Sequence, residues 1–419
     1  CGFARHVISL QNETLILFFV YRMAFNSSNS SLLISKFFPR GSPMVRFFAM
    51  FMCLLLSALS MGSVAAFADH PPEKLFRNFK AFGQLGETGQ LGPFTVNVAR
   101  FGNLPDGPAT SGPNSDFTGF LDDKFNLASI VMKEGAIIHE AYNDTRKIDS
   151  NTPLLGMSMS KTAVAAAVGS LICAGKIAKI DDRAGAYSGS LAETVFADVT
   201  IRNLLQMNSG VSPLGRGDEK IFNWKARGVN KFHGQASVRD ALRLYKSASR
   251  PQGETMNYHS TDTLALSVLV EEVSGMPASH YFHEKVYSAF GKSGYMHWTG
   301  DKSGTTVSFS DLSMTARDWA YFGAYLMGEM ERQTCLGNFF RDGIENAVST
   351  GRKNGSRYGY QSWVFDVHGT PALVMQGHGG QFIVLDQANR TLLLTISINE
   401  EYAAGNLFAN IHKFAERLQ

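Results

Sequence analysis

Several large classes of protein are disfavoured by what the chain lacks. Its 419 residues contain no run of basic side chains, no HExxH motif and no internal repeat. Without a basic run there is no electrostatic footprint for nucleic acid. His283-Glu284 lacks the second histidine of a zinc-protease motif. We therefore expect no nucleic-acid partner, no metal and no cofactor.

Cysteine is also scarce. The four residues Cys1, Cys53, Cys173 and Cys335 form neither a disulfide framework nor a zinc pattern. The sequence leaves open whether Cys173 pairs with Cys335, and it leaves the oligomeric state open as well.

Charge and hydrophobic content indicate a globular chain near neutrality. The composition is 44% hydrophobic and 18% charged, with 39 Lys and Arg residues against 36 Asp and Glu. Residues 1–68 hold five of the basic side chains and one of the acidic ones, so the remainder carries a net charge of about −1.

The N-terminal residues have the features of an exported protein. Residues 1–43 read as an upstream extension, because they begin with Cys and run into a Ser- and Asn-rich stretch. Residues 44–68 resemble a signal peptide, with Arg46, an apolar run over 47–59 and a small-x-small site at 66–68. A membrane anchor is the alternative, but the apolar run is short and diluted by serines. We expect a mature protein near Asp69, periplasmic or secreted, with no stable membrane anchor.

Strand patterns occur at both ends of the mature chain and helix patterns lie between them. Residues 69–120 read as a Gly- and Pro-rich extension with a short strand at 94–98, and residues 121–419 as one domain. Strands are expected at 128–132, 136–142, 360–367, 372–376, 382–386 and 392–398, and helices at 161–174, 200–207, 238–247, 261–273, within 310–326 and at 406–418. The predicted fold is α/β of the α+β type: an antiparallel sheet built from both chain ends, flanked by helices, with an inserted helical region at about 175–330.

Ser158 and Lys161 are the central candidates for chemistry. They are three residues apart at the start of an apolar, alanine-rich helix, so both side chains lie on one face. A helix N-terminus also favours developing negative charge. Burial in such a helix would lower the pKa of the lysine, which must be neutral to accept the serine proton. The alternatives are a capping serine and a solvated lysine.

A nucleophile elbow is disfavoured at this position. Residues 156–160 read GMSMS, with Ser where G-x-S-x-G requires Gly. An elbow also needs a strand directly upstream, and Pro153 leaves little room for one.

Two later stretches supply partners for a serine nucleophile. Tyr258 and Ser260 stand two residues apart just ahead of a helix, and we expect His259 between them to be structural. The turn at 377–381 contains His378, Gly380 and Gln381, and its glycines allow the backbone to approach a substrate closely.

Together these motifs resemble the serine β-lactamase and penicillin-binding-protein superfamily, in the order Ser-x-x-Lys, Tyr-x-Ser, His-Gly-Gly. Tyr258-His259-Ser260 is more similar to class C than to class A, and the stretches 201–210 and 315–323 also fit the family. Within the superfamily, the sequence most resembles 6-aminohexanoate-dimer hydrolases and class C-related carboxylesterases. The resemblance implies that Ser158 is acylated, that Lys161 is its base and that Tyr258 protonates the leaving group. It also implies an oxyanion hole from the N–H groups of Ser158 and Gln381.

Two departures shape the expected substrate. His378 stands where a class C enzyme usually has Lys, and Ser260 where it usually has Asn. We therefore expect a small ester or linear amide as substrate, with Gly380, His378 and Ser260 on the substrate side. The alternatives are a class C-like β-lactamase or D-Ala-D-Ala peptidase, and a penicillin-binding sensor without turnover.

Overall fold

A computed structural model describes residues 126–143, 148–211, 237–298, 300–301, 303–367 and 369–397. All of them belong to one compact unit, Pro72–Gln419. The predicted extension 1–43, signal peptide 44–68, segment 69–120 and helix 406–418 lie outside the described residues, as do residues 212–236.

An eight-stranded antiparallel sheet dominates the fold, in the order β2-β1-β11-β10-β9-β8-β7-β6. Its strands are β1 Asn126–Lys133, β2 Ala136–Tyr142, β6 Val348–Ser349, β7 Arg357–Gly359, β8 Ser362–Val367, β9 Thr370–Gly377, β10 Gln381–Asp386 and β11 Thr391–Ser397. The first strand of the sheet pairs with the last, so the sheet is built from both ends of the domain, as predicted. Glu134 and Gly135 both have positive φ (52° and 81°), as the tight turn between β1 and β2 requires.

Both faces of this sheet are buried. Along β10, Ile383 and Leu385 join the main hydrophobic core, whereas Phe382 and Val384 join a second apolar cluster on the opposite face. This alternation follows from the two-residue period of a strand. Helix α15 (Ala316–Glu331) packs against β1, β10 and β11 on the main-core side.

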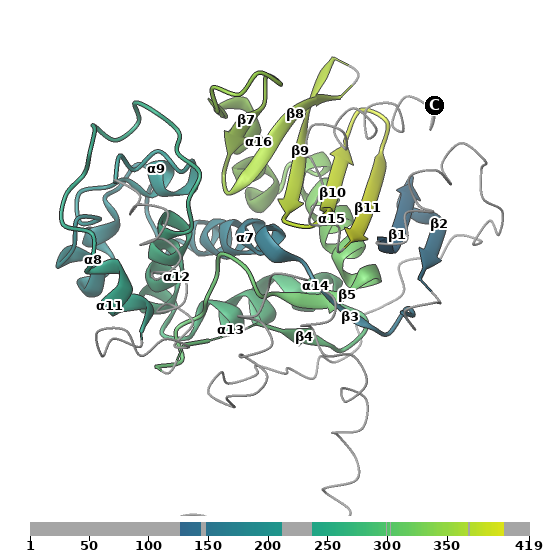
Figure 1. Cartoon of the computed structure of the whole chain (residues 1–419), viewed down its shortest axis with the longest axis horizontal. Helices are drawn as coiled ribbons and strands as arrows, with labels where there is room; N and C mark the ends of the chain where they lie inside the picture. Colours follow the sequence, from purple (N-terminus) through teal and green to yellow (C-terminus); the bar gives the residue numbers. More distant parts are fainter. Residues whose placement is uncertain are drawn as a thin grey trace, which may run out of the picture. The chain divides into compact units, whose positions relative to one another are not determined.

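Helix α7 (Ser160–Cys173) is the buried central helix that the sequence predicts. Its small side chains allow α12 (Thr261–Ser274) and α16 (Cys335–Glu345) to pack closely against it. In Figure 1, α7 lies between α12 and the end of the sheet where β9 and β10 meet.

The other elements between α7 and α15 are short. They are η3 Ala184–Ala186, α8 Gly189–Ala192, α9 Ile201–Leu205, α11 Val238–Leu242, α13 Ala278–Phe282, η5 His283–Tyr287, α14 Ser288–Phe290, β4 Met296–His297 and β5 Ser313–Thr315. Strand β3 (Pro153–Leu155) forms a three-stranded sheet with β5 and β4 and lies at its edge. An edge strand tolerates proline, and β3 is not the central strand that a nucleophile elbow would need.

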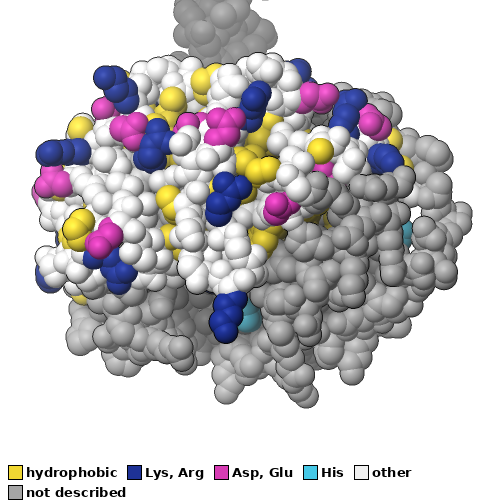
Figure 2. All heavy atoms as spheres, turned by 90° about the horizontal axis from the view of Figure 1, so that it is seen from above, with side chains coloured by type: hydrophobic (Ala, Val, Ile, Leu, Met, Phe, Trp, Pro, Cys, Tyr) yellow, Lys and Arg dark blue, Asp and Glu magenta, His cyan; other side chains and the backbone are white. Residues whose placement is uncertain are grey.

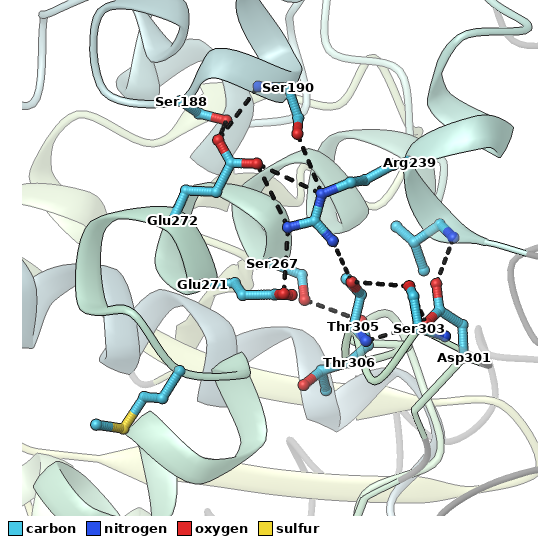
Figure 3. A network of polar contacts seen from close by, with 12 residues as sticks. Ser188, Ser190, Arg239, Ser267, Glu271, Glu272, Asp301, Ser303, Thr305 and Thr306 are labelled. Carbon is cyan, nitrogen blue, oxygen red and sulfur yellow. Dashed lines mark hydrogen bonds and ion pairs between the residues drawn. The ribbon is translucent and has the colours of Figure 1, made fainter.

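A polar network ties the helical region together, as Figure 3 shows. Arg239 of α11 pairs with Glu271 and Glu272 of α12. It also donates a hydrogen bond to Thr305, while Asp301 accepts one from the Val238 N–H at the start of α11. These contacts fix α11 and the 301–305 turn against α12, the helix that follows the predicted tyrosine.

The structure settles the pairing of cysteines that the sequence leaves open. Cys173 at the end of α7 forms a disulfide with Cys335 at the start of α16, with Cα atoms 5.7 Å apart. The sequence pattern does not predict α16. Its Gly337 and Gly343 lower helix propensity, yet the structure requires small residues there. A Cβ at Gly337 would lie 1.9 Å from the Glu329 carbonyl oxygen.

Candidate active site

Ser158 lies in a single 3-10 turn, η2 (Met157–Met159), immediately before α7. The sequence predicts Ser158 at the N-terminus of the helix, and the structure has it two residues before α7, in this turn. Met157 adopts a φ of 50°, a conformation that costs energy for a residue with a side chain. Met157 and Met159 are buried on either side, while Ser158 stays partly accessible. The backbone thus presents the hydroxyl from a tight, fixed turn.

Ser160 holds that turn in place. Its buried hydroxyl donates a hydrogen bond to the Met157 carbonyl (2.6 Å) and accepts one from the Leu312 N–H (3.2 Å). The Gly156 N–H in turn donates to the Leu312 carbonyl at 2.9 Å. Neither Ser160 nor this contact is predicted from the sequence, because residues 309–312 are remote in the chain and carry no motif.

Lys161 meets Ser158 as the sequence predicts. Its side chain is buried, and Nζ donates to Ser158 Oγ at 2.9 Å and to the Phe309 carbonyl at 2.7 Å. The solvated alternative for this lysine is therefore wrong. The Phe309 carbonyl, which no sequence motif marks, helps aim the nitrogen at the serine.

Tyr258 completes the group. The hydroxyls of Tyr258 and Ser158 share a hydrogen bond, and Lys161 Nζ lies 5.2 Å from the centre of the phenol ring. The ring stacks on Trp363 of β8 (centroids 5.3 Å apart) and meets Tyr358 of β7 edge-on. Burial raises the pKa of Tyr258 to about 12, against the opposing effects of the Ser158 hydrogen bond and the Arg352 charge. The phenol is therefore protonated at neutral pH and can donate a proton.

A buried polar pair, His259 and Asp262, follows the tyrosine in the chain. His259 Nδ1 accepts a hydrogen bond from the Thr261 N–H, and Nε2 lies 3.5 Å from Asp262 Oδ1. Ser209 donates to the same carboxylate oxygen at 2.8 Å, and burial raises the pKa of Asp262. His259 is thus placed to fix the backbone between Tyr258 and α12.

The β9–β10 turn lies against the Ser158 segment. A Cβ on Gly377 would be 2.3 Å from the Gly156 carbonyl oxygen, so only glycine fits there. Gly379 and Gly380 have φ values of 86° and 97°. The Gln381 side chain is buried and donates to the carbonyls of His378 (2.6 Å) and Ser397 (2.8 Å). Gln381 therefore fixes the turn through its side chain.

The remaining predicted site residues lie at the edge of this group. His378 is exposed within the β9–β10 turn, and Ser260 is partly accessible at the residue before α12. Their contact with substrate stays a prediction, as does the oxyanion hole.

Within the described ranges, no cluster of three or more His, Cys, Asp or Glu side chains could hold a metal ion. No helix there is long and apolar enough to cross a membrane. Figure 2 shows acidic and basic side chains interspersed on the face that it presents.

The family model named Beta-lactamase matches residues 121–412, which include every site residue above. The chain belongs to the β-lactamase family. Members of this family are serine hydrolases, acting as amidases or esterases, and the antiparallel sheet flanked by helices is their fold. Both the superfamily and the fold class predicted from the sequence are confirmed.

Solved structures give the same fold for this β-lactamase family member. A Bacillus anthracis protein assigned as a 6-aminohexanoate-dimer hydrolase has 19% identity and a TM-score of 0.66, over 81% of this chain and 95% of that one. A class C β-lactamase variant has 13% identity and a TM-score of 0.54, over 73% and 96%. A hydrolase with promiscuous acyltransferase activity has 15% identity and a TM-score of 0.54, over 68% and 92%. Comparison with curated protein sequences finds no match.

Proposed function

We propose that the protein hydrolyses an ester or a linear amide through an acyl-enzyme on Ser158. The observation that carries this proposal is the contact of one hydroxyl with two different proton carriers. Lys161 Nζ lies 2.9 Å from Ser158 Oγ, and the Tyr258 phenol shares a hydrogen bond with the same side chain. A nucleophile, a base and an acid are thus in direct contact.

In acylation, Lys161 in its amine form takes the proton from Ser158 while Oγ attacks the substrate carbonyl. The negative oxygen that forms is held by the N–H groups of Ser158 and Gln381, and one such donor is typically worth about 10²–10³ in rate. Tyr258 gives its proton to the departing amine or alkoxide and regains one from the Lys161 ammonium. The bond from the carbonyl carbon to the leaving group breaks, and Ser158 carries the acyl group.

In deacylation, the same groups act on water. Lys161, again in its amine form, takes the proton from the attacking water, either directly or through Tyr258, which passes on its own proton as it receives one. The ester bond to Ser158 breaks, and Lys161 returns the proton to Oγ. The free acid leaves, and the starting protonation states are restored.

The histidine at position 378 supports an ester or open amide over a β-lactam, because a class C enzyme usually has there a lysine suited to a β-lactam carboxylate. The structural neighbours include a protein assigned as a 6-aminohexanoate-dimer hydrolase, which would act on a linear amide. A class C-like β-lactamase or D-Ala-D-Ala peptidase is the alternative within the same chemistry.

We also propose that the protein works outside the cytoplasm, as a periplasmic or secreted enzyme on a small-molecule substrate, with no nucleic-acid partner and no stable membrane anchor. The Cys173–Cys335 disulfide supports this location, because such bonds persist mainly in oxidising compartments. Edman sequencing of protein exported by a bacterial host tests it, with cleavage near Asp69 as the expected result. Retention of the full chain in the cytoplasm would contradict it.

A substrate panel tests the catalytic proposal: short 4-nitrophenyl esters, aminohexanoate dimers, nitrocefin and D-Ala-D-Ala peptides. We expect turnover of an ester or linear amide that Ser158→Ala abolishes, with nitrocefin slower. Ester turnover that persists in Ser158→Ala would overturn the proposal. A penicillin adduct that forms on the wild-type protein and is never hydrolysed would instead favour the alternative of a penicillin-binding sensor without turnover.

A further inference from the structure

Arg352 places an exposed positive charge beside the catalytic tyrosine. Its guanidinium carbon lies 4.4 Å from the ring centroid of Trp363, and the same indole stacks on Tyr258 with centroids 5.3 Å apart. One aromatic side chain therefore connects the cation to the phenol. The Arg352 charge also acts on the Tyr258 hydroxyl, lowering its pKa against the larger effect of burial.

The loop that carries Arg352 is built to hold one conformation. It connects β6 to β7, and the Thr350 hydroxyl bridges its two sides by donating to the Ser356 carbonyl at 2.8 Å. The Arg352 N–H donates to that same hydroxyl, and the Arg352 carbonyl accepts from the Gly355 N–H. Gly351 and Gly355 supply the positive φ values (68° and 67°) that close the turn. The guanidinium is thus presented from a hydrogen-bonded turn.

No carboxylate neutralises this guanidinium among the described residues. Arg202 and Arg239, by contrast, each pair with acidic side chains. A planar guanidinium that rests on an aromatic face keeps its N–H groups free at the edge, where they can hold a carboxylate with two parallel hydrogen bonds. Arg352 is therefore suited to bind an anion from solution.

We propose that Arg352 binds a carboxylate on the leaving-group side of the scissile bond. This inference rests on the proposed function, in which Tyr258 protonates the leaving group, because the tyrosine fixes which end of the substrate lies near Arg352. The substrate class is then N-acyl amino acids with a free carboxylate, or acyl esters of hydroxy acids. The bond cleaved is the amide or ester bond, and the carboxylate departs with the amine or alcohol.

Two acetyl esters that differ only in leaving-group charge test this. The acetyl ester of 4-hydroxybenzoate carries a carboxylate, and that of 4-hydroxybenzamide is neutral with nearly the same shape. The measured quantity is the ratio of kcat/KM for the anionic over the neutral ester. The comparison uses the full chain, Arg352→Gln, and Lys353→Gln as a matched loss of one exposed cation from the same loop.

We expect Arg352→Gln to lower this ratio about tenfold, through KM more than kcat, and Lys353→Gln to leave it unchanged. Added salt should lower the wild-type ratio as well, because the contact is accessible to solvent. If Arg352 only steadied Trp363 and Tyr258, both esters would lose rate equally. An unchanged ratio in Arg352→Gln therefore overturns the inference and leaves the proposed function standing. Absence of turnover of both esters by the wild-type protein contradicts the proposed function itself.

Discussion

Tyr258 and Lys161 flank the same serine oxygen with different proton chemistry. Burial raises the pKa of Tyr258 to about 12, so its phenol is a proton donor over the whole neutral range. Lys161 is buried, with 2% of its surface exposed, and its Nζ donates a hydrogen bond to the Phe309 carbonyl at 2.7 Å. This geometry supports the proposed division of roles, in which the lysine accepts the serine proton and the tyrosine donates a proton to the leaving group.

This division predicts that Tyr258→Phe harms substrates with poor leaving groups most. For a linear amide we expect kcat/KM to fall about 10²–10⁴-fold, the usual worth of a general acid. For a 4-nitrophenyl ester the loss should be far smaller, because that leaving group needs no proton. Steady-state kinetics on both substrates measures the difference.

Tyr358→Phe is the matched control, since Tyr358 meets the Tyr258 ring edge-on and keeps that contact without its hydroxyl. Equal losses on amide and ester in Tyr258→Phe would contradict a role for the Tyr258 hydroxyl in protonating the leaving group.

At the scale of single elements, the 3-10 turn before α7 decides where the serine points. Ser160 joins the strained Met157 residue to the 309–312 segment by two buried hydrogen bonds. Removal of its hydroxyl leaves a buried carbonyl and a buried N–H without this partner, at a cost of about 1–3 kcal/mol.

We therefore expect Ser160→Ala to lower the free energy of unfolding by about 1–3 kcal/mol and to lower kcat as Ser158 loses its fixed position. Urea unfolding and ester kinetics measure the two effects. Ser170→Ala on the same helix is the control, because its hydroxyl makes a longer contact of 3.4 Å with Tyr281. A Ser160→Ala protein with wild-type kcat would contradict this role for the turn.

The sequence predicts those elements whose pattern is local. The hairpin around Glu134, the apolar helix α7 and the four late strands follow from period and turn residues alone, and all are present. Predicted helix 238–247 is shorter, ending at Leu242. Helix α16 and the short strands β6 and β7 were missed, because glycines and brief length hide their patterns.

The candidate site likewise contains residues that the sequence predicts and residues that it does not. Ser158, Lys161 and Tyr258 belong to short motifs, and the structure brings these three together. Phe309 contacts Lys161 through its backbone carbonyl, which any residue type could supply. Arg352 lies in the loop between β6 and β7, outside every sequence motif. Only the folded arrangement brings them to the site.

Across the whole molecule, the Cys173–Cys335 disulfide joins α7 to α16 over a sequence separation of 162. By lowering the entropy of the unfolded chain, such a cross-link stabilises the folded state by up to about 5 kcal/mol. We expect the Cys173→Ser/Cys335→Ser double variant to have a clearly lower Tm than the oxidised protein. Calorimetry with and without reductant measures this. An unchanged Tm in both experiments would show that packing of α16 on α7 suffices.

Buried and half-buried tyrosines predict the pH at which the fold is lost in alkali. Burial raises the pKa of Tyr258, Tyr295 and Tyr325 to about 12, and raises those of Tyr287 and Tyr358 as well. Because the folded pKa values exceed the unfolded value of about 10, this stability is complete below pH 10 and is lost as pH rises through the folded values. Tyrosinate absorbance and circular dichroism should therefore change together, in one cooperative step. Gradual tyrosinate formation near the unfolded pKa, with circular dichroism unchanged, would contradict this.

The measurement that tests the central claim most directly is the mass of the acyl-enzyme. The protein is mixed with a slowly hydrolysed ester, quenched in acid and analysed intact, then digested and mapped by tandem mass spectrometry. We predict one acyl group on Ser158, absent in Ser158→Ala, with Ser160 unmodified. An acyl group on another residue, or ester turnover by Ser158→Ala without any adduct, would contradict the account.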